Sequence, residues 1–195
     1  CELDAPGEFF FDEKSSILYL IPPEKLSSES SVNIWGGPGF LCFKGATYLS
    51  LEGVVVEGVG SGTAAVEVQS GSHLRMLGCT IRNCSRPAVV IKGGDDNGLI
   101  SCDLYDVPSH LTLEGGEVKS LKSAGNFAIN CHLTQIASTD YYGGIRVRGV
   151  GQVFRNNLVH NCPGQVMTFG GCDHRIANNE FFNVGFEEGD GGAIY

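Results

Sequence analysis

Short alternations of apolar and polar residues recur along most of the chain, and six of these segments can be aligned with one another. An alternation with a period of two is typical of a β-strand that is buried on one face. Each aligned segment is followed by a second short alternation, and most of these end at glycine, for example at Gly93 and Gly170. Glycine favours tight turns because positive φ angles cost it little. Each repeat therefore predicts at least two strands joined by turns.

The six segments share three columns of apolar or small polar residues. The first column contains Val54, Cys79, Cys102, Cys131, Asn157 and Asn179. The second column, two residues later, contains Val56, Ile81, Leu104, Leu133, Val159 and Phe181. The third column, three residues before the first, contains Leu51, Met76, Leu99, Ala128, Phe154 and Ile176. Successive members of the first column are 25, 23, 29, 26 and 22 residues apart. A repeat of this length with columns in register is typical of one coil of a β-solenoid.

These repeats predict an all-β chain in which residues 48–195 form a right-handed parallel β-helix of about six coils. Residues 1–47 do not fit the repeat. Within them, Glu8–Phe11 and Ile17–Ile21 flank a polar loop and predict a β-hairpin, followed by a segment that leads into the helix. Tyr195 falls within a predicted strand. We therefore expect that the helix is incomplete at this end, or that a partner protein chain covers the open coil.

Three of the cysteines occupy the first column, where side chains are expected to point inward. Cys79, Cys102 and Cys131 can fill a small apolar space, and Asn at the same position can pass a hydrogen bond to the next coil. We expect these three thiols to be unpaired, because stacked strands rarely orient their Cβ atoms as a disulfide requires. The disulfide-bonded alternative stays open, and with it the redox compartment.

The charge and hydropathy of the chain exclude two classes of partner. The net charge is −9 and no basic patch stands out in the sequence, so nucleic acid is not an expected partner. No apolar stretch approaches the roughly 18 residues of a membrane span, so a membrane is not expected either. The chain opens on Cys1 and Glu2 without the pattern of a signal peptide. If the protein is secreted, its signal has been removed.

Three phrases of the sequence carry a family resemblance: LDAPGEFFFDEKSSILYLIPP from Leu3, NNLVHNCPGQVMTFGGCDHRIANNEFFNV from Asn156, and EEGDGGAIY up to Tyr195. They resemble secreted right-handed β-helix proteins of the pectate-lyase-like superfamily, and within it the β-helix glycoside hydrolases. The resemblance covers nearly the whole chain and implies an extracellular protein that acts on or binds polysaccharide. The family often carries ionisable residues where this chain has Asn161, Gly164 and Phe182-Asn183. Since such groups move protons, these departures leave catalytic and non-catalytic alternatives open.

Two columns of the predicted helix are expected to face outward, because alternate residues of a strand point to opposite faces. One contains Thr80, Asp103, His132, Leu158 and Glu180, and the next contains Arg82, Tyr105, Thr134, His160 and Phe182. His160 and Glu180 should therefore lie diagonally on adjacent coils. A His near a carboxylate can act as a general acid or base, so both are candidate catalytic residues. The alternative is a surface pair that stabilises the stack.

Two longer connections, Ala137–Tyr142 and Gly185–Gly191, should lie on the same side of the solenoid and could frame a sugar-binding groove. A glycosidase needs two carboxyl groups, and Asp190 paired with Glu180 or Asp173 is the leading candidate pair. The candidate substrate-binding residues are Asp140, Tyr141, Tyr142, Asp173 and Glu188. The alternative is that these acidic, glycine-rich segments are simply soluble turns.

A polysaccharide lyase needs a base and a cation to neutralise the uronate. Arg146 and Arg148 project from one strand, but Arg148 aligns with Glu114 on the previous coil, which favours a surface ion pair. Asp95-Asp96 could bind Ca²⁺, although two acidic residues in a turn are weak evidence for it, and no other cofactor is expected. The leading hypothesis is an extracellular, glycoside hydrolase-like β-helix. The alternative is a structural or glycan-binding solenoid that assembles through its open coil.

Overall fold

The computed structural model describes residues 3–30, 32, 41–136, 144–187 and 192–195. Contacts divide the chain into two units, Cys1–Ile34 and Trp35–Tyr195, which are described separately. In the first unit, β1 (Phe9–Asp12) pairs antiparallel with β2 (Ile17–Leu20). The Asp12 carboxylate accepts hydrogen bonds from the Lys14 backbone and the Ser15 hydroxyl, at 3.0 and 2.6 Å, and thereby closes the turn. The predicted N-terminal hairpin is confirmed.

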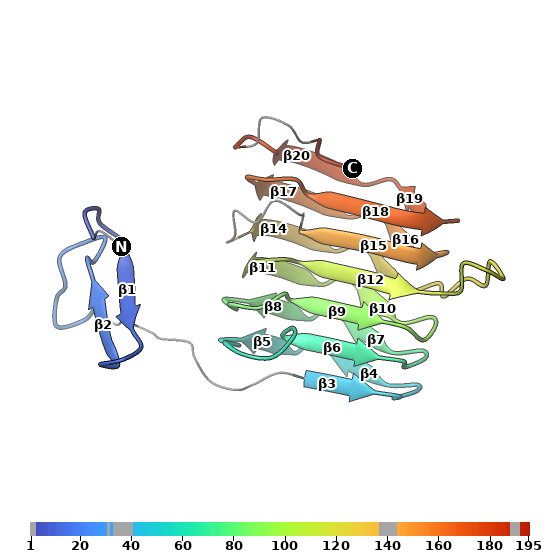
Figure 1. Ribbon diagram of the computed structural model, residues 1–195, viewed down its shortest axis with the longest axis horizontal. Helices are drawn as coiled ribbons and strands as arrows, with labels where there is room; N and C mark the ends of the chain where they lie inside the picture. The colour runs from blue at the N-terminus through green and yellow to red at the C-terminus, as the bar shows by residue number, and fades with distance from the viewer. Residues whose placement is uncertain (1–2, 31, 33–40, 137–143, 188–191) are drawn as a thin grey trace. The chain divides into compact units, whose positions relative to one another are not determined.

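The second unit is a parallel β-solenoid built from three sheets of six strands each (Figure 1). Sheet 1 contains β3 (Leu41–Lys44), β6 (Val66–Gln69), β9 (Val89–Lys92), β12 (Leu111–Gly115), β15 (Ile145–Val150) and β18 (Met167–Cys172). Sheet 2 contains β4 (Ser50–Glu52), β7 (Arg75–Leu77), β10 (Gly98–Ile100), β13 (Phe127–Ile129), β16 (Val153–Arg155) and β19 (Arg175–Ala177). Sheet 3 contains β5 (Val55–Glu57), β8 (Thr80–Arg82), β11 (Asp103–Val107), β14 (His132–Ile136), β17 (Leu158–Cys162) and β20 (Glu180–Val184). The predicted solenoid is confirmed, with about five complete turns.

Each coil has three strands. The aligned segment of each repeat forms one strand of sheet 2 and one of sheet 3, and the second alternation forms the strand of sheet 1. A residue with positive φ follows the sheet 2 strand, such as Gly78 at 56° or Asn156 at 56°. Glycine and asparagine tolerate this conformation better than other residues do. The residue after this positive-φ residue, such as Cys79 or Asn157, belongs to the first column of the sequence. The first column therefore lies at the bend between sheets 2 and 3.

Side chains of this bend link neighbouring coils by hydrogen bonds. The Cys79 thiol donates to the Leu51 carbonyl at 3.2 Å, and the Asn157 amide donates to the equivalent carbonyl of Ala128 at 3.1 Å. The Asn157 side-chain oxygen also accepts the Cys131 N–H at 2.8 Å. Cys and Asn therefore play the same structural role in this column, and Asn adds an acceptor.

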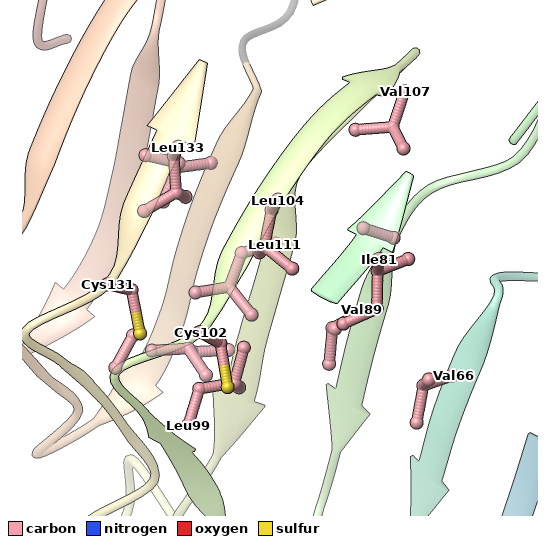
Figure 2. Close-up of a cluster of buried hydrophobic side chains, with 14 of the residues drawn as sticks. Val66, Ile81, Val89, Leu99, Cys102, Leu104, Val107, Leu111, Cys131 and Leu133 are labelled. Carbon is pink, nitrogen blue, oxygen red and sulfur yellow. The ribbon is translucent and has the colours of Figure 1, made fainter. Parts of the chain in front are cut away.

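The inward-facing columns form one continuous hydrophobic core. Figure 2 shows part of it, where Leu99, Leu104 and Leu111 come from the three sheets and pack beside Cys102 and Cys131. The described cysteines are all free thiols, so the prediction of unpaired core cysteines is confirmed.

At the last coil this core is less covered: Phe169 aligns with buried Val147 in sheet 1, yet Phe169 is 51% exposed. In the described part of the chain, no helix is long and apolar enough to span a membrane.

Candidate functional site

A groove of about 380 Å³ lies over the outer face of sheet 1. Its floor is made of paired outward-facing positions on three neighbouring strands. These residues are Val90 and Lys92 on β9, Thr112 and Glu114 on β12, and Arg146 and Arg148 on β15. Parallel register places equivalent positions of successive coils side by side, so the floor runs along the axis of the solenoid.

The rim of the groove comes from the connections between sheet 3 and sheet 1. Arg86, Ser109, Gly144 and Gln165 belong to four successive connections, and all line the groove. The Gly144 carbonyl accepts hydrogen bonds from the backbone N–H of Leu111 and from the Ser109 hydroxyl, at 2.9 and 3.1 Å. The rim is thereby tied to the first residue of β12, and its polar groups face the groove together with the charged floor.

The groove is strongly cationic although the whole chain carries a net charge of −9. Four cationic side chains line it, and Glu114 is its one carboxylate among the described residues. The four cations are Arg86, Lys92, Arg146 and Arg148. A concave surface of one charge sign concentrates ligands of the opposite sign. The groove is therefore suited to an anionic ligand.

The ion pair expected between Arg148 and Glu114 is not formed. The two residues are paired in register, as the sequence predicts, and Lys92 is the partner of Glu114 on the other side. However, the ion pairs among the described residues, at N–O distances up to 4.0 Å, include neither cation with Glu114. The strand register places the backbone of Glu114 beside those of Arg148 and Lys92. It does not bring the charged ends of these long side chains into contact.

A hydrogen-bonded histidine pair lies on the outer face of sheet 3. The Nε2 atoms of His132 on β14 and His160 on β17 are 2.8 Å apart. Nδ1 of His132 lies 3.6 Å from an Asp103 carboxylate oxygen, and Nδ1 of His160 lies 3.2 Å from the Thr134 hydroxyl. The Phe182 ring stacks on His160 with 4.6 Å between centroids. The pair therefore spans strands β11 to β20.

A third histidine is buried between this face and the groove. His110 is fully buried, and its Nε2 lies 2.9 Å from the Thr134 carbonyl, which makes Nε2 the protonated nitrogen. Among the described residues its Nδ1 has no hydrogen-bond partner. A Cβ added to Gly144 would lie 2.9 Å from this Nδ1, so His110 sits directly behind the groove rim. Burial lowers the pKa of His110 to about 4, so the ring is neutral at neutral pH.

The candidate catalytic pair has the expected placement but no direct interaction. Glu180 pairs in register with Leu158, and His160 pairs with Phe182, so the two candidates lie in neighbouring columns of adjacent coils. Glu180 is exposed, and no described hydrogen bond or ion pair joins it to His160. The structure instead brings His160 against His132.

The remaining candidates fall in two places. Asp173 is exposed in the turn between β18 and β19. This turn lies at the C-terminal ends of the sheet 1 strands, whereas the groove rim lies at their N-terminal ends. Asp140, Tyr141, Tyr142, Glu188 and Asp190 lie outside the described residues. The described ends of their two connections lie on the same side of the solenoid, since both lead from sheet 3 to sheet 1.

The turn that contains Asp95 and Asp96 uses its carboxylates for bonds within the protein. Asp96 accepts hydrogen bonds from Arg75 and His73 at 2.6 and 2.7 Å, and Asp95 accepts one from Ser72 at 2.9 Å. Burial raises the pKa of Asp96, but these hydrogen bonds and charges outweigh it and lower the pKa overall. A Ca²⁺ ion here would compete with Arg75 for the same oxygen. Across the described ranges, no group of three or more His, Cys, Asp or Glu side chains is placed to hold a metal.

Several groove and histidine residues were not singled out from the sequence. His132 and Asp103 stand in an outward column of the aligned repeats, so the column itself could have identified them as neighbours of His160. Lys92 could have been found in the same way beside Glu114 and Arg148. Arg86 lies in a connection that has no repeat pattern, and only the fold places it at the groove.

Comparison with known proteins identifies no family for this chain. No family model, no curated protein and no solved structure matches the chain. The chain is a parallel β-solenoid on its own geometry.

Proposed function

We propose that this solenoid is an extracellular protein that binds acidic polysaccharide along the sheet 1 groove. The observation that carries the proposal is the cationic lining: Arg86, Lys92, Arg146 and Arg148 line the groove, and Glu114 is the one carboxylate that the described residues contribute to it, in a chain of net charge −9. Polysaccharides that carry uronate or sulfate groups present a regular row of negative charges. Guanidinium groups recognise such groups by paired, charge-assisted hydrogen bonds.

The shape and the neutral lining of the groove also suit a sugar chain. The floor crosses three coils, so an extended polymer could contact cations on β9 and β15 at the same time. Thr112 and Ser109 add hydroxyl groups for the hydroxyls of the sugar. The resemblance of the sequence to secreted β-helix proteins agrees with an extracellular, carbohydrate-binding role, and it remains part of the proposal.

Polysaccharide cleavage is a second candidate function, favoured by the histidine pair. His160 is hydrogen-bonded to His132, which lies beside the Asp103 carboxylate, and a His so oriented can act as a general base. Hydrolysis would use Glu180 and Asp190 as its carboxyl groups. Release of reducing ends from an acidic polysaccharide, lost in Glu180→Gln and in Asp190→Asn, would support hydrolysis. Release that is unchanged in both variants would exclude this assignment.

Binding is tested with polygalacturonate oligomers by calorimetry at two salt concentrations. Lys92→Gln and Arg148→Gln should each weaken binding by about tenfold, about 1.4 kcal/mol, and binding should weaken as salt rises. Lys119→Gln is the matched control, because Lys119 is exposed and does not line the groove. Equal binding of a neutral glucan, or tighter binding of single-stranded DNA, would overturn the proposal. A sulfated oligomer in parallel distinguishes sulfate from uronate recognition.

A further inference from the structure

The charges of the sheet 1 groove are distributed coil by coil. The coil of β9 contributes Arg86 and Lys92, and the coil of β15 contributes two further cations, Arg146 and Arg148. The coil of β12 lies between them in the stack (Figure 1). Among the described residues, the one charged side chain that this middle coil contributes to the groove is Glu114. Along the groove, the charge of the lining therefore changes from positive to negative and back to positive.

The strand register determines the spacing of this alternation. Glu114 on β12 pairs with Lys92 on β9 and with Arg148 on β15. Neighbouring strands lie about 4.8 Å apart, so Lys92 and Arg148 leave their strands about 10 Å apart, with Glu114 halfway between them. All three side chains leave the same face of sheet 1, because equivalent positions of parallel strands in register point the same way.

The middle coil also presents neutral polar groups beside its carboxylate. Thr112 lies two residues before Glu114 on β12, and Ser109 lies at the rim in front of the same strand. The Ser109 hydroxyl donates its hydrogen to the Gly144 carbonyl at 3.1 Å, so its oxygen can only accept a hydrogen bond from a ligand. A carboxylate is likewise an acceptor only. The middle coil is therefore suited to the hydroxyl groups of a neutral sugar, and it repels an anion.

The spacing of the coils can be compared with that of a polysaccharide. An extended sugar chain advances by about one strand spacing for each residue, so three consecutive sugars can face the three coils. A polymer with a carboxylate on every sugar would place one of its charges opposite Glu114. Like charges in such opposition weaken binding. A polymer whose charged and neutral sugars alternate avoids this contact and still brings anions to Lys92 and Arg148.

We propose that Glu114 makes the groove selective for acidic polysaccharides in which charged and neutral sugar residues alternate. This selectivity rests on the proposed polysaccharide binding and defines the charge pattern of its ligand. The two outer coils bind the charged sugars, and the middle coil receives the neutral one. A repulsive group between attractive ones discriminates against a competitor that carries an additional charge at that position.

Two galacturonate hexamers of equal net charge separate the effect of charge pattern from that of total charge. In the alternating hexamer, methyl esters neutralise every second residue. In the block hexamer they neutralise three adjacent residues, so it contains no charged–neutral–charged run of three sugars. Calorimetry at low salt should give an affinity for the alternating hexamer about threefold to tenfold higher than for the block hexamer.

Substitutions of Glu114 test whether its charge is the cause of this preference. Glu114→Gln should bring the two affinities within about twofold of each other, whereas Glu114→Asp, which keeps the charge, should retain the preference. Glu52→Gln is the matched control and should also retain it, because Glu52 is exposed on sheet 2 and does not line the groove.

The fully ionised hexamer distinguishes failure of the selectivity from failure of the proposed function. If it binds but the wild-type chain has equal affinities for the alternating and block hexamers, the selectivity is overturned and polysaccharide binding stands. A preference that survives in Glu114→Gln overturns the selectivity in the same way. If none of the three hexamers binds, the polysaccharide binding and the selectivity are overturned together.

Discussion

Glu114 and Arg148 occupy paired positions on neighbouring strands, and no ion pair within 4.0 Å joins them. Lys92 is the partner of Glu114 on the other side and is likewise not paired with it. Exposed ion pairs contribute at most about 1 kcal/mol to the stability of a protein. Charged residues at these positions would therefore add little to the stability of the solenoid even if they formed ion pairs. The arrangement instead leaves two cations with one carboxylate between them on the floor of the groove. We infer that this row of charges is arranged for a ligand.

Replacing the Glu114 carboxylate on the groove floor should strengthen anion binding. Glu114→Gln removes a negative charge between two cations, so affinity for polygalacturonate oligomers should rise about threefold to tenfold in calorimetry at low salt. Glu52→Gln is the matched control, since Glu52 is exposed on sheet 2 and lies outside the groove. An unchanged or weaker affinity in Glu114→Gln would argue that the ligand does not pass this position.

The bend between sheets 2 and 3 should be sensitive to the chemistry of Asn157. This residue is 2% exposed, and its side chain joins Cys131, Ala128 and Asn179. Asn157→Ala leaves buried polar groups without partners, and urea unfolding should show a loss of about 3 kcal/mol. Asn157→Cys should cost less, because Cys79 and Cys102 serve as donors at the same position of earlier coils. Equal losses in the two variants would contradict the shared role of Cys and Asn.

Acid should destabilise the solenoid through His110. Burial lowers the folded-state pKa of this residue to about 4, below the value near 6.5 of the unfolded chain. The unfolded state therefore takes up the proton first. The stability from neutral His110 is complete above about pH 6.5 and is lost as pH falls toward 4. At about 1.4 kcal/mol for each pKa unit, the loss approaches about 3 kcal/mol.

The measurement is urea unfolding at pH 7.0, 5.5 and 4.5 for the wild type and for His110→Gln. The glutamine amide can still donate to the Thr134 carbonyl but does not titrate. The variant should lose less stability over this range than the wild type. Parallel pH profiles would show that His110 is protonated in the folded state as easily as in the unfolded state.

Two adjacent glycines should respond differently to alanine. Gly171 has a φ of +112°, and an added Cβ would lie 2.0 Å from the Gly149 carbonyl oxygen of the previous coil. Gly170 has no atom within 4 Å of that position and no positive φ. Gly171→Ala should lower the free energy of unfolding by more than about 2 kcal/mol, whereas Gly170→Ala should change it by less than about 0.5 kcal/mol. Thermal unfolding of both variants checks this, and similar melting temperatures would be inconsistent with the close approach of these turns.

The architecture could be predicted from the sequence because each coil repeats the same inward columns. Val56, Ile81 and Leu104 are aligned in the sequence and paired in sheet 3. The division of each aligned segment into two strands was not predicted, since a single positive-φ residue such as Asn156 makes the bend without interrupting the apolar pattern. Local alternation identifies strands, and it does not distinguish one bent strand from two.

The candidate sites were less accessible to sequence reasoning, because they depend on side chains from different coils. The outward columns correctly predict that His160 lies next to Thr134, but a column gives no side-chain direction, so it does not show that His160 contacts His132 and not Glu180. The groove combines floor residues in register with Arg86 from an irregular connection. A surface of this kind appears only when the coils are stacked, since no local pattern marks its rim.

The most direct test of the central claim is a residue-resolved NMR titration of the chain with a polygalacturonate oligomer. The account predicts saturable shifts concentrated at backbone amides of β9, β12 and β15, including Lys92, Thr112 and Arg148, with little change on sheet 2. Shifts that fall mainly outside sheet 1, or no shifts at millimolar oligomer, would contradict the assignment of the cationic groove as a binding site for acidic polysaccharide.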